Sequence, residues 1–556
     1  MRAALQRVGL ARMFHTLMET TTGFRVGTPR RGVRTYGNTD ASARRPYQCD
    51  ICKAGLALAL VLAVSGWPAL AAPRPFYNVR SYGASGNGKA LDTKAIQKAV
   101  DACAVKGGGK VLIPAGRYVT GPIFLKSRVQ IELEAGAVLL GSTNMADYPA
   151  IDGRWEGIER RVYASLFTGR GLENVSITGR GVLDGRGAGW WAAHRATSAL
   201  RRKAGLTGRE PENPPDAPLR WPRPRMINLY ECTNVLLRDI TIRDSPSWNV
   251  HPVYCENVTL DNLTVIAPTN SPNTDAVDPD SCRNVRISNC YFDVGDDCVV
   301  IKSGYNEDGR RVGIPCEDVL VSNCTFGHGH GGVVIGSEMS GSVRNVAVVN
   351  CVFDGTQRGL RVKTAPGRGG VVEGFRASNL VMRNIMEAAF SITAAYDDRQ
   401  SAAATRTPSP ESIPVMRHVH WSDISVNGAG KLAELSGLEV SPLEDMSLVN
   451  VQVTGARSGI RCENAHGVRL ENIQFQPASG PALEARNVSK LDVLRLEVQE
   501  PNGDQPVITL EGVSGALLRD CAVASGTGVF LKLTGTNTGV TCEGNRLAGG
   551  VQERAQ

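Results

Sequence analysis

A short phrase recurs along most of this chain, and it constrains the possible folds more than any other feature. The phrase is Asn-Val, then alternating apolar and polar residues, then a polar residue or Asn and a second short alternating stretch. Clear copies begin at Asn174, Asn234, Asn257, Asn284, Asp318 and Asn345, and weaker copies begin near His418, Asp445, Gly467, Lys490 and Gly515. A repeat of roughly 20–50 residues indicates a solenoid, a propeller or another array.

The pattern inside each copy favours strands. Alternation with a period of two residues, bounded by turns, is typical of strands rather than helices. Abundant Gly (61 residues) and scarce aromatics (6%) suit many short strands and tight turns. We therefore predict an all-β, parallel β-helix solenoid, in which each coil buries its inward side chains against the coils above and below. A β-propeller is the alternative, but its blades usually need longer and more even units.

Two residue types occupy equivalent places in successive copies. The amides are Asn262, Asn289, Asn323 and Asn350, and the thiols are Cys290, Cys324 and Cys351. We expect the amides to bond one another at a stacked bend. We expect the thiols to form a buried column rather than disulfide bridges. After residue 72 the sequence has no C-x-x-C pair, so it gives no support to a zinc or redox site.

The N-terminal segment is typical of a targeting signal. A cationic lead up to Lys53 precedes an apolar run over residues 54–64, and Ala69–Ala72 ends it with an A-x-A pattern. These features indicate a secretory signal, so we expect the protein to be secreted or periplasmic. A membrane anchor is the alternative, but Gly66 and Pro68 leave the run short for a membrane span.

Charge is unevenly distributed along the chain. Ten basic and three acidic residues in 1–53 account for seven of the eight net positive charges. The remainder is near neutral, which gives no case for a nucleic-acid partner.

We divide the chain into three predicted parts. These are a leader and secretory signal at 1–72, a parallel β-helix catalytic region at 73–404, and continuing coils with a C-terminal cap of the same domain at 405–556. An amphipathic helix is predicted from Asp92 or Thr93 to Ala104, where it would cap the open end of the solenoid. Residues 195–224 are rich in Arg and Pro, and we interpret them as a loop inserted on one face.

Residues able to do chemistry gather in four short blocks. In order they are Asn273-Thr274-Asp275, Gly295-Asp296-Asp297, Gly329-His330-Gly331 and Arg361-Val362-Lys363. Asp275 and Asp296 are about one coil apart, so Asp275 can lie beside the Asp296–Asp297 pair on an adjacent coil. Arg361 and Lys363 are two residues apart, so on a strand they share one face. The predicted fold can therefore stack three acids, an imidazole and two cations into one patch.

That combination suits the hydrolysis of an anionic sugar. Adjacent carboxylates repel when both ionise, so the pKa of one should rise. A protonated and an ionised carboxyl are the acid and base that glycoside hydrolysis needs, and room for a water between them would make the reaction inverting. Fixed cations can hold a sugar carboxylate.

Each signal also has an ordinary structural explanation. An Asp-Asp pair is usually a solvated turn, a His between glycines is often a turn residue, and Arg-x-Lys on a strand is usually exposed. A set of five acids could instead hold calcium: Asp275, Asp278, Asp280, Asp296 and Asp297. The order of the blocks at coil spacing favours the catalytic interpretation.

The four blocks resemble the motifs of the polygalacturonase family of glycoside hydrolases, family 28. The family motifs are Asn-Thr-Asp, Gly-Asp-Asp, Gly-His-Gly and Arg-Ile-Lys, and this chain differs only at Val362. The resemblance runs from about residue 76 to 400. It implies a right-handed parallel β-helix that cleaves α-1,4-linked galacturonan, a pectin of plant cell walls, by inversion.

The resemblance also implies roles for single residues. By match, Asp296 would be the general acid, Asp275 and Asp297 would activate water, and His330 would orient or tune the acid. His328 is a second candidate for that histidine, but His330 alone has Gly on both sides.

On the same basis Arg361 and Lys363 would hold the galacturonate carboxylate, and Tyr396 resembles a family tyrosine that contacts sugar. The expected partner is a polysaccharide, with no nucleic acid and no stable membrane partner. We expect a monomer that needs no metal and no cofactor.

Several functions remain open from the sequence. Both exo and mid-chain cleavage are possible. If residues 195–224 and a loop from Ser303 to Pro315 block one end of the cleft, they favour exo cleavage. Two alternative enzymes could have the same architecture. One is a calcium-dependent pectate lyase, and the other is a hydrolase of rhamnogalacturonan or xylogalacturonan. A non-catalytic adhesive solenoid is disfavoured because all three acids are present, and retention of Arg361 and Lys363 favours plain galacturonan.

Overall fold

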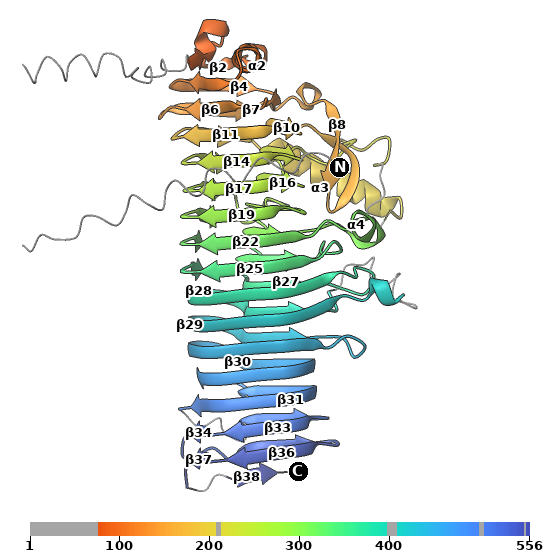
Figure 1. Cartoon of the computed structure of the whole chain (residues 1–556), viewed down its shortest axis with the longest axis vertical. Coiled ribbons are helices and arrows are strands. Elements are labelled where there is room, and N and C mark those ends of the chain that lie inside the picture. The colour runs from red at the N-terminus through yellow and green to blue at the C-terminus, as the bar shows by residue number, and fades with distance from the viewer. Residues whose placement is uncertain (1–75, 207–212, 397–408, 500–504, 550–551, 556) are drawn as a thin grey trace, which may run out of the picture. The chain divides into compact units, whose positions relative to one another are not determined.

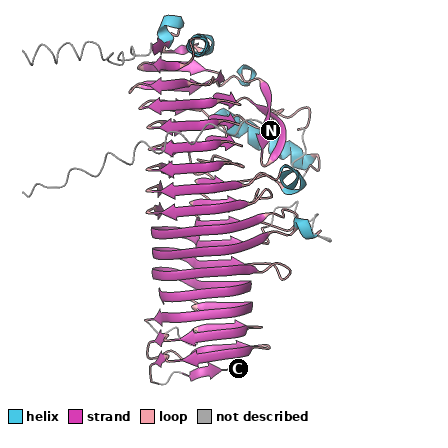
Figure 2. Cartoon of the chain, viewed as in Figure 1, coloured by secondary structure: helices cyan, strands magenta, loops and turns pink. Residues whose placement is uncertain are grey.

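The computed structural model describes residues 76–206, 213–396, 409–499, 505–549 and 552–555. Strands of this part of the chain stack in parallel, coil upon coil (Figures 1 and 2). The predicted all-β parallel β-helix is therefore confirmed. The predicted leader at 1–72 lies outside the described residues, and the division at residue 405 stays a prediction. Within the described ranges, no helix has the length and apolar character needed to cross a bilayer.

One coil illustrates the repeat. β25 (Val343–Val349), β26 (Val352–Asp354) and β27 (Arg358–Lys363) follow one another, and each pairs in parallel with its counterpart in the preceding coil. We call the stacks to which these strands belong the first, second and third faces. Each face thus repeats the same register from coil to coil.

The remaining strands extend these faces. The first face contains β3 (Gly109–Ile113), β6 (Val129–Leu133), β11 (Glu173–Gly179), β14 (Thr233–Arg238), β17 (Glu256–Asp261), β19 (Arg283–Ser288) and β22 (Cys316–Ser322). The second contains β4 (Gly116–Thr120), β7 (Ala137–Gly141), β12 (Val182–Asp184), β15 (Thr241–Arg243), β18 (Thr264–Ile266), β20 (Tyr291–Asp293) and β23 (Thr325–Phe326). The third contains β5 (Ile123–Phe124), β10 (Phe167–Arg170), β13 (Ile227–Tyr230), β16 (Val250–Val253), β21 (Val299–Ile301) and β24 (Val333–Gly336).

Later strands are longer and run around the bends. They are β28 (Val371–Thr393), β29 (Val415–Ser436), β30 (Leu443–Gln474) and β31 (Leu483–Val498). The stack ends with β32 (Ile508–Glu511), β33 (Ser514–Arg519), β34 (Ala522–Val523), β35 (Val529–Thr534), β36 (Thr538–Glu543), β37 (Arg546–Leu547) and β38 (Gln552–Ala555). It begins with β1 (Phe76–Asn78), the 3-10 turn Val79–Tyr82 and β2 (Asn87–Leu91).

Asparagine shapes the bends, as expected. Asn262, Asn289 and Asn323 have φ values of 53°, 59° and 55°, in the left-handed region that Asn tolerates better than most residues. Asn323 Nδ2 donates to Asn289 Oδ1 at 3.4 Å, which is the expected bond between amides. Asn262 and Asn289 instead donate to carboxylates, of Asp239 and Asp261, both at 2.8 Å. The repeated Asn therefore both permits the bend and links it to its neighbour.

The interior is a set of stacked columns. Phe326 stacks between Phe292 and Phe353, with ring centroids 5.8 and 4.6 Å away. Cys290, Cys324 and Cys351 are all buried with free thiols, and the Cys324 backbone N–H donates to Cys351 Sγ on the next coil at 3.5 Å, as expected for a buried thiol column.

The predicted capping helix is confirmed as α2 (Thr93–Val105). Its apolar residues Ile96, Val100 and Cys103 are buried in the main core. Asp92 precedes the helix, but its carboxylate accepts from the backbone N–H groups of Ser85 and Gly86 rather than capping α2.

Additional elements project on the side of the third face (Figure 1). They are the antiparallel hairpin of β8 (Ala150–Trp155) and β9 (Ile158–Tyr163), α3 (Ala188–Lys203) and α4 (Asn306–Val312). Two predictions need correction here. The inserted segment 195–224 is not all loop, because α3 extends to Lys203, and the loop from Ser303 to Pro315 contains α4. In α3, buried Trp190 and the basic residues of the last turn favour a helix over a loop.

Candidate active site

The predicted acids lie on one bend, between the second and third strands of successive coils. Val277 and Val299 form an isolated parallel bridge, which sets Asp275 beside Asp297 on the next coil. One carboxylate oxygen from each of Asp275, Asp296 and Asp297 lies within 4.8 Å of the other two. The structure thus brings the three acids of two sequence blocks into one cluster.

Burial and neighbouring charges shift the pKa values of Asp297 and Asp275 in opposite directions. Lys363 Nζ donates to Asp297 Oδ2 at 2.7 Å. Burial alone would raise the pKa of Asp297, but the charges of Lys363 and Arg361 outweigh it and lower that pKa. Burial, followed by the charge of Asp296, raises the pKa of Asp275 well above its usual range. A protonated and an ionised carboxyl can therefore stand side by side, which is the pairing that acid–base chemistry needs.

His330 contacts the most exposed acid of the cluster. Its Nδ1 lies 3.0 Å from Asp296 Oδ1, and its backbone N–H donates to the Asp296 carbonyl. The hydrogen bond to Asp296 raises the pKa of His330. His328 instead lies 3.1 Å from Asp293 and is exposed. The structure thus places His330, rather than His328, against the acids.

The two cations and the tyrosine form a second group beside the acids. Val362 is buried in the core, so Arg361 and Lys363 project outward from β27. The Tyr396 ring centroid lies 5.5 Å from Arg361 Cζ and 5.6 Å from Lys363 Nζ. A cavity of about 480 Å³ opens beside this group, toward the C-terminal coils; its lining includes Arg358, Arg361, Tyr396, Glu434, Arg461 and Glu463.

Toward the N-terminal coils the same bend is covered by the additional elements. Trp155 at the end of β8 stacks on Trp248 with ring centroids 4.5 Å apart. Trp191 of α3 donates from its indole N–H to the Ser245 carbonyl at 2.9 Å. Trp248 and Ser245 belong to the bend that precedes Asp275 in the stack. The acids are therefore walled on one side and adjoin an open cavity on the other.

Sequence reasoning missed Arg223, which ties this wall to the acid cluster. The buried guanidinium donates to the carbonyls of Pro246 and Pro272 at 2.7 and 2.8 Å, and to Asn273 Oδ1 at 2.7 Å. It thereby fixes the backbone immediately before Asp275. The Arg-rich composition of residues 195–224 was the available signal, but it could not identify which arginine turns inward.

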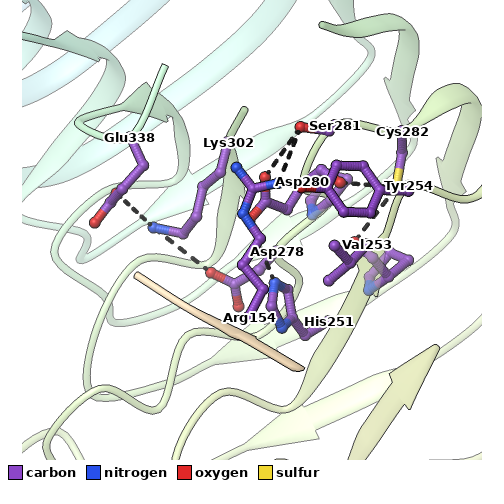
Figure 3. Close-up of polar contacts among 12 residues, drawn as sticks. Arg154, His251, Val253, Tyr254, Asp278, Asp280, Ser281, Cys282, Lys302 and Glu338 are labelled. Atoms are coloured by element: carbon purple, nitrogen blue, oxygen red, sulfur yellow. Dashed lines mark hydrogen bonds and ion pairs between the residues drawn. The ribbon is translucent and has the colours of Figure 1, made fainter. Parts of the chain in front are cut away.

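A second buried charged group lies next to the cluster (Figure 3). Its ion pairs are Arg154 with Asp280 at 3.2 Å, Lys302 with Glu338 at 3.2 Å and Lys302 with Asp278 at 3.8 Å. The charge of Arg154 outweighs burial and lowers the pKa of Asp280, whereas burial raises the pKa of Asp278 well above its usual range despite the nearby Lys302. This pairing disfavours the calcium interpretation, which needed all five acids to face one ion.

A parallel β-helix with clustered carboxylates, an imidazole and two adjoining cations defines a class: a glycoside hydrolase of β-helix architecture. The model of glycosyl hydrolases family 28 matches residues 103–474. The chain belongs to this family.

Three relatives support the same assignment. A probable polygalacturonase of Vitis vinifera is 33% identical over 382 residues, covering 67% of this chain and 73% of the relative. The exo-poly-alpha-D-galacturonosidase of Dickeya chrysanthemi is 28% identical over 438 residues, covering 69% and 71%. The crystal structure of a hyperthermoactive exopolygalacturonase from Thermotoga maritima superposes with a TM-score of 0.62 at 31% identity, covering 76% of this chain and 92% of that one.

Proposed function

We propose that this enzyme hydrolyses α-1,4-linked galacturonan, and that the described cluster is its active site. The observation that carries the proposal is the meeting of Asp275, Asp296 and Asp297 beside Arg361 and Lys363 on one bend. Acids alone would suit a neutral sugar. Two cations at the edge of the same cavity suit one that carries a carboxylate.

Burial suggests which acid donates the proton. Asp296 is the acid with the greatest side-chain exposure next to His330, so the glycosidic oxygen can reach it. Asp296 gives its proton to that oxygen as the bond to the anomeric carbon breaks. Asp297 is held ionised by Lys363, and it takes a proton from the attacking water.

Asp275 has a different part in this scheme. Its pKa is raised, so at rest it can hold a proton of its own, in addition to the proton that Asp296 donates. The protonated carboxyl can orient the water by a hydrogen bond while Asp297 acts as base. The family resemblance assigns Asp275 and Asp297 one common role, the activation of water. In this proposal Asp297 is the base and Asp275 orients the water.

The stereochemical outcome needs its own measurement. In general, carboxyl groups of inverting enzymes lie about 6.5–9.5 Å apart and those of retaining enzymes about 5–5.5 Å apart. One oxygen of each acid here lies within 4.8 Å of an oxygen of the other two, a spacing that one bridging water can span. We infer inversion, because Asp275 and Asp297 can hold a water together while Asp296 faces the leaving group. Proton NMR of the first product anomer decides between the two.

We further infer exo action. The hairpin of β8 and β9 and the α3 segment cover the bend on the N-terminal side of the acids, while the cavity lined by Tyr396 and Arg461 continues on the other side. A long chain can then enter from one direction only. Two of the relatives named above are exo-acting by name, which also supports exo action for this enzyme.

The test is a product-resolved digestion of polygalacturonate with and without chelator. We expect saturated products of one short length from the earliest time points, at a rate that chelator does not change. Mixed mid-sized products would contradict exo action alone. Unsaturated products that chelator abolishes would identify a pectate lyase and overturn the hydrolase proposal. A parallel digestion with Asp296→Asn excludes a contaminating activity.

The location and the partners follow from the substrate. Galacturonan is an extracellular polymer, so we infer that the enzyme is secreted or periplasmic and that it acts as a monomer on a polysaccharide. Cell fractionation and light scattering of the purified enzyme test these two inferences.

A further inference from the structure

A second cluster of ligand-type side chains lies on the first face, away from the proposed active site. It consists of His418 and His420 on β29 and Asp445 on β30, and one ligand atom from each lies within 4.8 Å of the other two. His418 Nδ1 is 2.7 Å from Asp445 Oδ2, and His420 Nε2 is 3.5 Å from the same oxygen. We propose that these three side chains form a binding site for a divalent transition-metal ion such as Zn²⁺.

The geometry fits a tetrahedral ion. Zinc lies about 2.0–2.1 Å from His nitrogen and carboxylate oxygen, which places neighbouring ligand atoms roughly 3.4 Å apart. His420 Nε2 lies 3.5 Å from Asp445 Oδ2, which is close to that spacing. The His418 imidazole needs only a small rotation to exchange its direct hydrogen bond to Asp445 for a shared ion. Water would supply the remaining ligand, as it does in open three-ligand sites.

The surroundings support the site in two ways. His420 Nδ1 lies 2.9 Å from Ser447 Oγ, which holds the ring with its other nitrogen turned toward Asp445. Such a partner on the second ring nitrogen is typical of metal-binding histidines. On the side of the preceding coil, His418 lines a cavity of about 470 Å³ together with Gly374, so its imidazole has space to rotate.

The bend geometry alone does not explain these residues. His418 and Asp445 occupy the positions where earlier coils place Asn345 and Asp318, and there an Asn suffices to bond the neighbouring coil at 3.0 Å. A His is not needed for that contact, and the contact gives no reason for His420. Nitrogen ligands favour Zn²⁺, Ni²⁺ or Cu²⁺ over Ca²⁺ or Mg²⁺.

One neighbouring charge opposes the ion. Arg376 lies opposite His420 on β28 and lines the same cavity. Glu373 also lines it, but this carboxylate is already paired with Arg344 and Arg417. The charge of Arg376 should therefore weaken the site, so Arg376→Gln should tighten metal binding.

The test is Zn²⁺ titration of the untagged full-length enzyme by calorimetry after treatment with chelator. Cys49 and Cys52 are also metal-ligand types. The readout is therefore the difference between the parent and each variant. We expect His420→Asn and Asp445→Asn to lose one bound Zn²⁺ or to weaken its affinity by at least about tenfold. His466→Asn is the matched control, because His466 makes a similar contact to Ser489 Oγ at 2.8 Å on the next coils.

Further outcomes decide the proposal without reference to the active site. Zn²⁺ should raise the unfolding temperature of the parent but not that of His420→Asn, and polygalacturonate hydrolysis should be the same in both. Equal stoichiometry and affinity in the parent and His420→Asn would overturn the proposal. Displacement of Zn²⁺ by an equal concentration of Ca²⁺ would also overturn it.

Discussion

Two stretches of the same solenoid differ sharply in what they bury. Between residues 223 and 368 the described chain buries many charged side chains; among them are Arg223, Arg225, Asp275, Asp278, Asp280, Asp297, Lys302, Glu338, Arg361, Lys363 and Arg368. In the described coils from residue 409 onward, the buried polar residues are Ser412 and Thr527, and neither is charged. The repeat therefore fixes the stacking in both stretches, and the buried charge distinguishes the one that carries the proposed active site.

A single column of the third face makes the contrast local. The register aligns Lys363 with Arg486 through the intervening coils. Lys363 pairs with Asp297, and their side chains are 11% and 1% exposed. Arg486 pairs with Glu511, and theirs are 54% and 45% exposed. The same position of the same repeat thus holds a buried, high-cost pair in one stretch and a solvated pair in the other.

The largest expected effect comes from removing the proposed proton donor. Asp296→Asn keeps the shape of the side chain but cannot donate a proton as an acid. General acid catalysis typically contributes about 10²–10⁴-fold, so hydrolysis of polygalacturonate should fall by at least that factor. The fold should persist, as measured by circular dichroism and thermal unfolding.

The control for this variant lies in the other stretch. Asp423→Asn replaces an exposed bend residue by the Asn that other coils carry there, and it should leave activity unchanged. Comparable activity in Asp296→Asn and the parent would contradict the proposed role of Asp296.

The second effect tests the column directly. Lys363→Met leaves the Asp297 carboxylate buried without its ion-pair partner, and breaking such a pair typically costs about 3–5 kcal/mol. Chemical denaturation should show a loss of that size in the free energy of unfolding. Arg486→Met removes a solvated pair from the same column and should leave that free energy near the parent value. Equal losses in the two variants would show that the difference in burial has no energetic consequence.

The third effect concerns the wall that covers the N-terminal side of the acids. Arg223→Met removes the donors that fix Pro272 and Asn273, so the backbone before Asp275 can shift. A displacement of about 1 Å can cost on the order of 10²-fold in rate, so we expect kcat to fall by up to that factor with a smaller change in KM. Arg220→Met, an exposed arginine of the same insertion, is the control. A loss seen in KM alone would argue that Arg223 acts on binding rather than on positioning.

These contrasts also explain what the sequence could predict. The stacking, the bend asparagines and the meeting of Asp275 with Asp297 follow from local pattern and coil spacing, because a repeat determines its own register. Two of the three partners of Arg223, Pro272 and Asn273, lie 49 and 50 residues further along the chain, inside a different coil. Such a contact depends on how an insertion folds back, and no periodicity encodes it. For the same reason the second half of α3 and all of α4 fall in segments that the sequence predicts as loops: the repeat contains no information on segments that leave it.

The smallest expected effect is a shift in the pH profile of activity. It should distinguish Arg361 from Arg461, two arginines of another column. The register aligns Arg361 with Arg461, but the charge of Arg361 acts on Asp297, whereas the exposed Arg461 pairs with the half-buried Glu463. Burial raises the pKa of Asp297, and Lys363 and Arg361 reverse that effect and lower it. The base therefore stays ionised as the pH falls, and the acid limb of kcat/KM should lie at low pH. Arg361→Gln removes part of the lowering, so the acid limb should move to higher pH, whereas Arg461→Gln should leave it in place. An unmoved limb in Arg361→Gln would mean that a group other than Asp297 sets it.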